Sequence, residues 1–241
     1  FVNTKLNPLY PAYYSADTFH DWLMRTFGTG ICKSFMLAYN EKFWKVPLKE
    51  MTCEWVDKFI AVPTMEQVIE GAMLDVDKEY GYNSAFMYPE SGGISQIAEK
   101  MTKRIKDRVL YKRKLTGLDA KNKIASFSDG TKITYKRLVL TLPLPELANI
   151  LTTAPQTVTD SLGGLDYLSV ININFATGTN TSNGRNWVYC PEPDTTCFRF
   201  GFPDTYPACA PDGKGNVYTE TTCLPGEDAR TIKAKVIAEL E

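Results

Sequence analysis

The first third of the chain, up to about residue 73, has apolar residues at the spacing of amphipathic helices. Ser15 or Asp17 is placed to cap a first helix, and Gly28–Gly30 would interrupt it. Thr64 would cap a later helix over residues 65–73. The pattern predicts a helical subdomain over residues 1–80. The apolar face of its first helix is formed by Phe19, Trp22, Leu23 and Phe27.

The middle of the chain mixes short strands with two helices. A glycine turn at Gly92 and Gly93 precedes an amphipathic helix whose face Ile94, Ile97, Ala98 and Met101 is predicted to point inward. A further helix would start at Pro143 and run to Leu151. Residues 81–150 are therefore predicted to form a ββα-type segment. Its expected strands are Lys114–Leu118, Lys123–Ser128, Lys132–Tyr135 and the apolar run Arg137–Leu142.

From about Gly164 the pattern changes to alternation. Ile171, Ile173 and Phe175 share one face of a long strand, while Asn172 and Asn174 point the other way. The last residues return to a helical pattern, so residues 151–241 are predicted to form an antiparallel sheet plus a helix. The fold class expected for the chain is α+β. Further strands are expected at Trp187–Cys190, Phe198–Phe202 and Val217–Thr222.

Composition and charge narrow the class of partner. The chain has 241 residues, 44% of them hydrophobic, and a formal net charge of −1, so nucleic acid is not an expected partner. The basic run over residues 103–114 is either a solvated helix end or a phosphate-facing patch. No run of 18 apolar residues predicts a membrane span, and no signal peptide is visible. The six cysteines include no CxxC pair, which favours reduced thiols and a cytoplasmic location.

Several kinds of active site are excluded by motif and count. The single histidine, His20, lies in a helical pattern next to Asp21, and no GxSxG motif accompanies it. A metal site with several histidine ligands is excluded by number, and no metal ligands are assigned. Neither a Walker A loop nor a GxGxxG fingerprint is present.

The stretch FMLAYNEKFWKVP groups four aromatic side chains around one amide, that of Asn40. Flat apolar faces beside an amide that donates and accepts suit a planar, polar ligand such as a nucleobase. Packing in a core is the alternative, and the spacing of this stretch by itself favours it, because aromatic residues at helical spacing usually serve packing. The aromatic side chains are Phe35, Tyr39, Phe43 and Trp44.

A second candidate group lies on two consecutive predicted strands. Trp187 and Tyr189 point to the same face of the first strand, and a hairpin would bring Arg199 near Tyr189. A guanidinium beside phenol and indole rings is a plausible anchor for phosphate or carboxylate. Cross-strand packing at a sheet edge is the alternative.

These residues occur in an order that resembles the UDP-galactopyranose mutase family, particularly its eukaryotic type, within the flavin amine-oxidase-like superfamily. The resemblance begins with TFHDWLMRTFGTGICKSFMLAYNEKFWKVPLKEMTCEW and continues through YNSAFMYPESGGI, DGTKITYKRLVLTLPLPEL and WVYCPEPDTTCFRF. It implies an FAD-binding domain visited by residues 81–150, a helical domain and an antiparallel substrate sheet. It also implies FAD as the cofactor and a small-molecule substrate of the nucleotide-sugar class.

The resemblance assigns roles by position. Trp187, Tyr189 and Arg199 match catalytic residues that hold the diphosphate and sugar. Positions for substrate binding are Phe35, Tyr39, Asn40, Trp44 and Asn83. Positions near the flavin are Gly92, Gly93, Leu115, Thr141, Leu142 and Pro143.

Phe59 departs from the family pattern, because the mutases carry a second arginine there and this chain has Lys58 only beside it. An apolar group in place of a phosphate-binding one leaves two alternatives open: an amine-oxidase-like oxidoreductase, such as a protoporphyrinogen-oxidase-like enzyme, and a non-catalytic binding module with a decayed flavin site. The family's dinucleotide fingerprint and further active-site tyrosines do not occur in these residues. We therefore expect residues 1–241 to be the central part of a flavoenzyme, and to bind FAD poorly and lack turnover alone.

Overall fold

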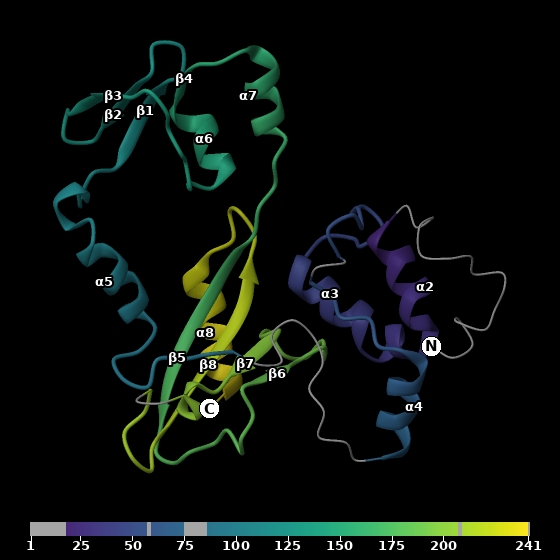
Figure 1. Ribbon diagram of the computed structural model, residues 1–241. Coiled ribbons are helices and arrows are strands. Elements are labelled where there is room, and N and C mark those ends of the chain that lie inside the picture. The colour runs from purple at the N-terminus through teal and green to yellow at the C-terminus, as the bar shows by residue number, and fades with distance from the viewer. Residues whose placement is uncertain (1–17, 57–58, 75–85, 207–208, 241) are drawn as a thin grey trace. The chain divides into compact units, whose positions relative to one another are not determined.

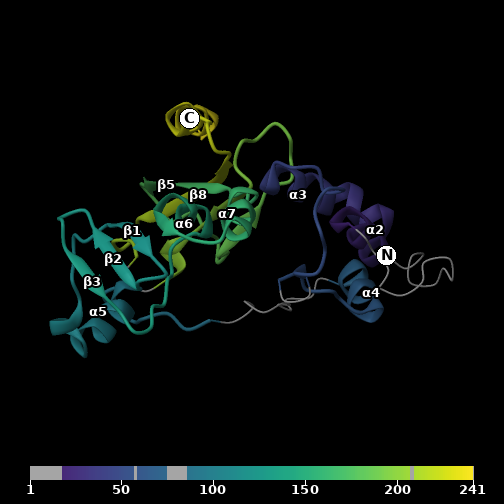
Figure 2. The same cartoon turned by 90° about the horizontal axis from the view of Figure 1, so that it is seen from above.

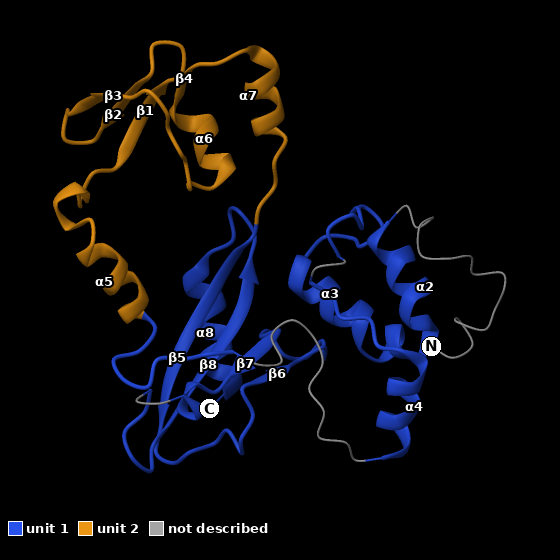
Figure 3. Ribbon diagram, in the orientation of Figure 1, with its two compact units in different colours: residues 1–94, 168–241 blue, residues 95–167 orange. Residues whose placement is uncertain are grey.

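The computed structural model describes residues 18–56, 59–74, 86–206 and 209–240. The chain forms two compact units (Figure 3). The first contains residues 1–94 and 168–241, and the second contains residues 95–167. The division at residues 80 and 150, predicted from the change in hydrophobic pattern along the chain, stays a prediction.

The first unit begins with helices. Helix α2 (Phe19–Ile31) continues through a π-helical turn, η2 (Cys32–Met36), into α3 (Leu37–Trp44), and α4 (Met65–Met73) follows (Figure 1). Gly28 has φ 74° and kinks α2, at the position where an interruption was expected. The N-cap of α2 is Thr18, whose hydroxyl accepts from the N–H of Asp21 at 3.2 Å. The expected caps at residues 15 and 17 lie outside the described residues.

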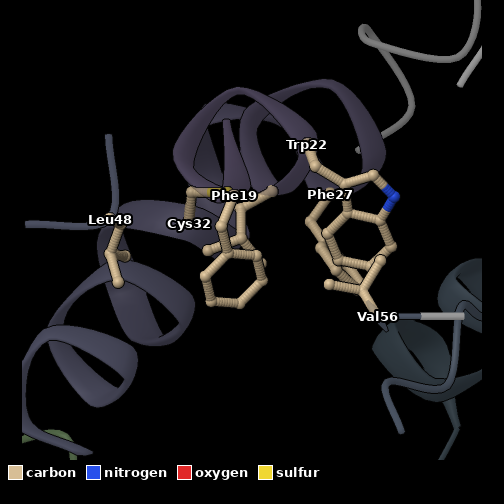
Figure 4. Close-up of a cluster of buried hydrophobic side chains, with 7 residues drawn as sticks. Phe19, Trp22, Phe27, Cys32, Leu48 and Val56 are labelled. Carbon is tan, nitrogen blue, oxygen red and sulfur yellow. The ribbon is translucent and has the colours of Figure 1, made fainter. Parts of the chain in front are cut away.

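The predicted apolar face of α2 is the centre of a core (Figure 4). All four of its predicted members, Phe19, Trp22, Leu23 and Phe27, are buried, and Leu48 and Val56 close the cluster from the segment after α3. Burying side chains of this size contributes about 1.5–3 kcal/mol each. Thr64 caps α4 as predicted, and the structure adds a capping box in which Thr64 and Gln67 bond reciprocally.

The rest of the first unit is a four-stranded antiparallel sheet in the order β5-β8-β7-β6 (Figure 1). Its long strands are β5 (Ser169–Thr177) and β8 (Gly215–Cys223), and its short ones are β6 (Trp187–Tyr189) and β7 (Arg199–Gly201). The turn η5 (Pro203–Thr205) follows β7, and helix α8 (Ala229–Leu240) ends the unit. The strands and the final helix agree with the sequence pattern.

The two faces of this sheet differ in chemistry. On one face Ile173 and Cys197 pack against Val236 of α8, which is fully buried. Figure 2 shows this C-terminal helix on one side of strands β5 and β8. On the other face the register places Tyr189 beside Arg199, Arg199 beside Glu220 and Glu220 beside Asn172. The alternation predicted for β5 is therefore confirmed, and it leaves one face of the sheet polar.

The second unit contains a smaller sheet in the order β3-β2-β1-β4. β1 (Leu115–Asp119), β2 (Ile124–Phe127) and β3 (Lys132–Thr134) are antiparallel, as expected from the Asp129-Gly130 turn, and β4 (Leu151–Thr153) is parallel to β1. Its helices are α5 (Ser95–Lys103), η4 (Lys106–Arg108), α6 (Leu144–Ile150) and α7 (Gln156–Gly163). Strand β4 and helix α7 were not expected from the sequence.

Two expectations for the second unit are wrong. Residues 137–142 are not a strand, and Val139 is 87% exposed, because no strand among the described residues pairs with this segment. The face of Ile97 and Met101 on α5, with Ile94 just before it, is exposed and not inward. Among the described residues no buried cluster includes these side chains.

The α+β class is confirmed. Across the described part of the chain, no helix has the length and apolar character needed to span a bilayer. All six cysteines are free thiols, and four of them are buried. Burial raises the pKa of Cys32 to about 11, so its thiol stays protonated at neutral pH.

Candidate functional site

The first unit contains a cavity of about 410 Å³ between helix α3, the segment that follows it and the β6–β7 hairpin. This volume is in the range of small-molecule sites. Five side chains expected to bind or position a substrate meet here: those of Tyr39, Asn40, Trp44, Tyr189 and Arg199. The other lining residues are Phe43, Trp55, Phe59 and Ile60.

Helix α3 supplies the aromatic wall. Tyr39 lies in a series of stacked rings between Phe35 (5.1 Å) and Phe43 (6.3 Å), because residues four apart share one face of a helix. Burial, followed by the neighbouring Tyr189, raises the pKa of the Tyr39 phenol above its usual value. Tyr39 is therefore a protonated group at neutral pH. The Nδ2 of Asn40 donates to the carbonyl of Met36 at 2.8 Å, so the helix fixes the orientation of this buried amide.

The β6–β7 hairpin supplies the cationic wall. Arg199 lies over the ring of Tyr189, with 5.9 Å from its guanidinium carbon to the ring centroid, as the hairpin pairing predicted. Its Nε donates to Glu220 at 2.5 Å. Burial opposes the charge of Arg199, but the hydrogen bond and charge of Glu220 outweigh it and raise the pKa of Arg199 above its usual value. Arg199 is therefore a permanent, oriented cation.

The two walls touch through their rings. Tyr39 meets Tyr189 edge to face at 5.4 Å, and Phe43 meets Phe198 edge to face at 4.8 Å. A planar group could enter beside α3 while an anion reaches Arg199. Among the described residues that line the cavity, Arg199 is the one cationic side chain.

Phe59 contributes to this cavity as an apolar group. It packs against Trp55 at 6.4 Å between ring centroids and lines the wall near Trp44. The structure therefore places the residue that departs from the mutase pattern at the site itself. Lys58 lies outside the described residues.

Several predicted site residues lie elsewhere. Trp187 does not line the cavity, and its Nε1 donates to the hydroxyl of Tyr218 at 2.7 Å. Phe35 reaches it only through Tyr39. Asn83 lies outside the described residues. Gly92 and Gly93 both have φ 72°, which explains the choice of glycine, but their place beside a flavin stays a prediction.

Sequence reasoning missed Glu220, Trp55 and Tyr218. Glu220 and Tyr218 are two residues apart on β8, so the sequence could have predicted that they share one face of the strand. Their partners on β7 could not be predicted, because they depend on the order of the strands in the sheet. Trp55 lies in an irregular segment after α3, where no helix or strand periodicity predicts which way a side chain points. Its ring lies 5.3 Å from that of Trp44.

A second cavity, of about 610 Å³, lies within the second unit. The predicted cofactor positions Leu115, Thr141 and Leu142 line it, and Pro143 instead caps helix α6. Its walls are mainly apolar, with Arg113 and Lys114 on one side. Arg113 is already paired with Asp129 and also donates to Thr131.

Comparison with known proteins assigns the chain to a family. The family model of the flavin-containing amine oxidoreductases matches residues 15–240. The chain belongs to this family. A flavin cofactor is therefore implied for it, and the comparison supports an enzyme family without identifying the substrate.

Solved structures show the same fold. A reduced UDP-galactopyranose mutase is 23% identical with a TM-score of 0.82, over 98% of this chain and 53% of that one. A protein from Pyrococcus furiosus is 12% identical with a TM-score of 0.64, over 95% of this chain and 55% of that one. A protein from Exiguobacterium, provisionally assigned as a protoporphyrinogen oxidase, is 13% identical with a TM-score of 0.62, over 100% of this chain and 54% of that one. The chain thus spans about half the length of these structures.

The cavity of the second unit fits part of a flavin cofactor. Its volume and apolar walls suit a planar ring, and Lys114 offers a cation to a phosphate. The cofactor would supply the redox or covalent chemistry of the reaction. The residues described here would contribute binding and orientation.

Proposed function

We propose that this chain is the substrate-binding part of an FAD-dependent enzyme that resembles UDP-galactopyranose mutase, and that the cavity of the first unit binds a nucleotide-sugar-like molecule. One observation carries the proposal: the aromatic wall of α3 and the oriented Arg199 face a single cavity. A nucleobase and a diphosphate are the two groups that such walls suit.

Each side chain has a role in this proposal. Trp44 offers an aromatic ring to the base, while Tyr39, whose faces are stacked by Phe35 and Phe43, offers its ring edge and hydroxyl. The fixed amide of Asn40 limits the orientation of the base. Arg199 neutralises the diphosphate, and Glu220 holds its guanidinium in place. The protein thereby positions the substrate, while the cofactor performs the bond chemistry.

The decisive variant is Arg199→Ala, tested by calorimetric titration with uridine diphosphate. We expect affinity to fall at least about tenfold, because the diphosphate loses its charged partner. Arg199→Lys should recover only part of it, since an ammonium cannot reproduce the guanidinium fork. Arg185→Ala, an exposed arginine just before β6, is the matched control. Equal affinity in Arg199→Ala and the control would remove Arg199 from the site.

Phe59 favours a second candidate, an oxidoreductase of the same family acting on an amine or another reduced carbon. An apolar ring in the cavity wall suits such a substrate better than a diphosphate. Oxygen consumption with a panel of amines, set against binding of uridine diphosphate, separates the two. A longer form of the protein that is colourless would instead support a non-catalytic binding module.

A further inference from the structure

Lys42 makes an unusual set of contacts for a lysine on a helix. Its ammonium donates to the carbonyl of Cys190 at 3.0 Å, to the carbonyl of Cys197 at 3.2 Å and to the hydroxyl of Thr195 at 2.8 Å. The carbonyl of Glu192 is a fourth acceptor, so the three N–H groups of the ammonium are shared among four oxygens. All these oxygens belong to the connection between β6 and β7, so one side chain holds the whole loop.

The main chain of Lys42 is held as well. Its carbonyl accepts from the hydroxyl of Thr222, a buried residue of β8, at 3.2 Å. Helix α3 is therefore attached at this one residue both to the central strand of the sheet and to the β6–β7 loop. Burial lowers the pKa of the Lys42 ammonium, which shows that the group gives up hydration to make these bonds.

Lys42 does not line the cavity, but the residues on either side of its contacts do. On α3, Tyr39 and Phe43 form the aromatic wall, and on the hairpin, Tyr189 and Arg199 flank the loop that Lys42 holds. The edge-to-face ring contacts between the walls orient the rings but do not hold the main chain of the loop against sliding. Hydrogen bonds from an ammonium to several carbonyls are directional and oppose it.

We propose that Lys42 is a positioning residue that sets the separation between the aromatic wall of α3 and the cationic wall of the β6–β7 hairpin. Its effect is confined to ligands that touch both walls at once. The class of ligand, a base joined to a diphosphate, rests on the proposed function; the positioning role itself rests on the contacts of Lys42.

Lys42→Met tests the role, because methionine keeps most of the side-chain length and apolar stem but cannot donate. Lys45→Met is the matched control: Lys45 is the C-cap of α3 and pairs with Glu227 at 2.8 Å, away from the hairpin. Calorimetry compares uridine diphosphate with uridine alone and pyrophosphate alone. We expect Lys42→Met to lower the affinity for uridine diphosphate about tenfold, and the affinities for uridine and for pyrophosphate by less than about twofold. Lys45→Met should change none of the three affinities by more than about twofold. Unchanged binding of uridine diphosphate, or equal losses for all three probes, would overturn the positioning role.

A measurement without ligand separates this proposal from the proposed function. The amide of Cys190 bonds the carbonyl of Phe198, and that of Phe198 bonds the carbonyl of Glu220. In Lys42→Met we expect hydrogen exchange at these two amides to rise about tenfold, with β5 unchanged, and no such rise in Lys45→Met. Hydrogen exchange that rises uniformly across the first unit, or that does not rise at the hairpin, would contradict the positioning role of Lys42. Failure of the unsubstituted protein to bind uridine diphosphate would sink the proposed function and leave this result standing.

A second variant keeps the test available if Lys42→Met does not fold. Thr195→Val removes one acceptor of the ammonium without touching α3. Thr195→Val should raise the hydrogen-exchange rates of the Cys190 and Phe198 amides as well, by a smaller factor than Lys42→Met. No change at either amide would count against the role of Lys42.

Discussion

At the scale of single residues, the site depends on side chains that fix one another. Glu220 orients Arg199 with a 2.5 Å bond, and Tyr218 orients Trp187 with a 2.7 Å bond. Both pairs cross from one strand to another on the polar face of the sheet. Gly201 lies between Trp187 and Tyr218 in the register, and a Cβ there would overlap the Tyr218 ring.

Gly201→Ala should therefore destabilise the protein by about 1–3 kcal/mol, because the methyl group forces the Tyr218 ring out of place. Denaturant unfolding measures the change. Gly71→Ala is the control: Gly71 lies inside α4 with open space where a Cβ would be, and alanine there should stabilise by up to about 1 kcal/mol. Two variants of equal stability would show that Tyr218 can move freely.

At the scale of elements, a strand forms where the chain supplies a partner for it. The hairpins β1–β2 and β6–β7 were predicted because alternation and turn residues are local signals. Residues 137–142 were predicted to form a strand because they are apolar, yet no described strand pairs with them. Strand β4 was missed for the opposite reason, since its parallel pairing with β1 depends on a distant segment.

In the second unit, Asp119 at the end of β1 connects this strand to β4. Its carboxylate accepts from the backbone N–H of Asn122 at 2.9 Å and from the hydroxyl of Thr153 at 2.7 Å, and these bonds lower its pKa to about 2. A carboxylate whose pKa falls on folding stabilises the folded state above its unfolded pKa, and loses that effect as pH falls through the folded value.

Asp119→Asn should therefore lower the midpoint of thermal unfolding at pH 7. The difference from the unsubstituted protein should shrink between about pH 4 and pH 2, where Asp119 itself becomes protonated. Thermal unfolding over this range measures it. Asp107→Asn, an exposed aspartate of the same unit, is the control. A difference that stays constant with pH would show that the charge of Asp119 is not involved.

At the scale of the whole molecule, the two cavities lie in different compact units and have different chemistry. The first has aromatic walls and an oriented arginine, and it contains most of the predicted substrate positions. The second is mainly apolar and contains Leu115, Thr141 and Leu142. A division between substrate-binding and cofactor-binding parts follows from this distribution as a proposal.

Of the two cations that line the second cavity, Arg113 is engaged by Asp129, which leaves Lys114 alone to meet a diphosphate. We expect the 241-residue chain to bind FAD weakly, with a Kd above about 10 µM, in a titration that follows flavin fluorescence. Far-ultraviolet circular dichroism of the same sample controls for folding. A chain that keeps flavin colour through purification would contradict this expectation.

The sequence by itself determined the α+β class, the apolar face of α2, the Thr64 cap of α4, the alternation of β5 and the pairing of Tyr189 with Arg199. Each of these is a local pattern, set by helix or strand periodicity or by a turn that joins neighbouring segments. Only the tertiary structure decided that Glu220 orients Arg199, that Phe59 faces the cavity and that Lys42 holds the hairpin. Those contacts join segments far apart in the chain, and no periodicity records which distant backbone a side chain will meet.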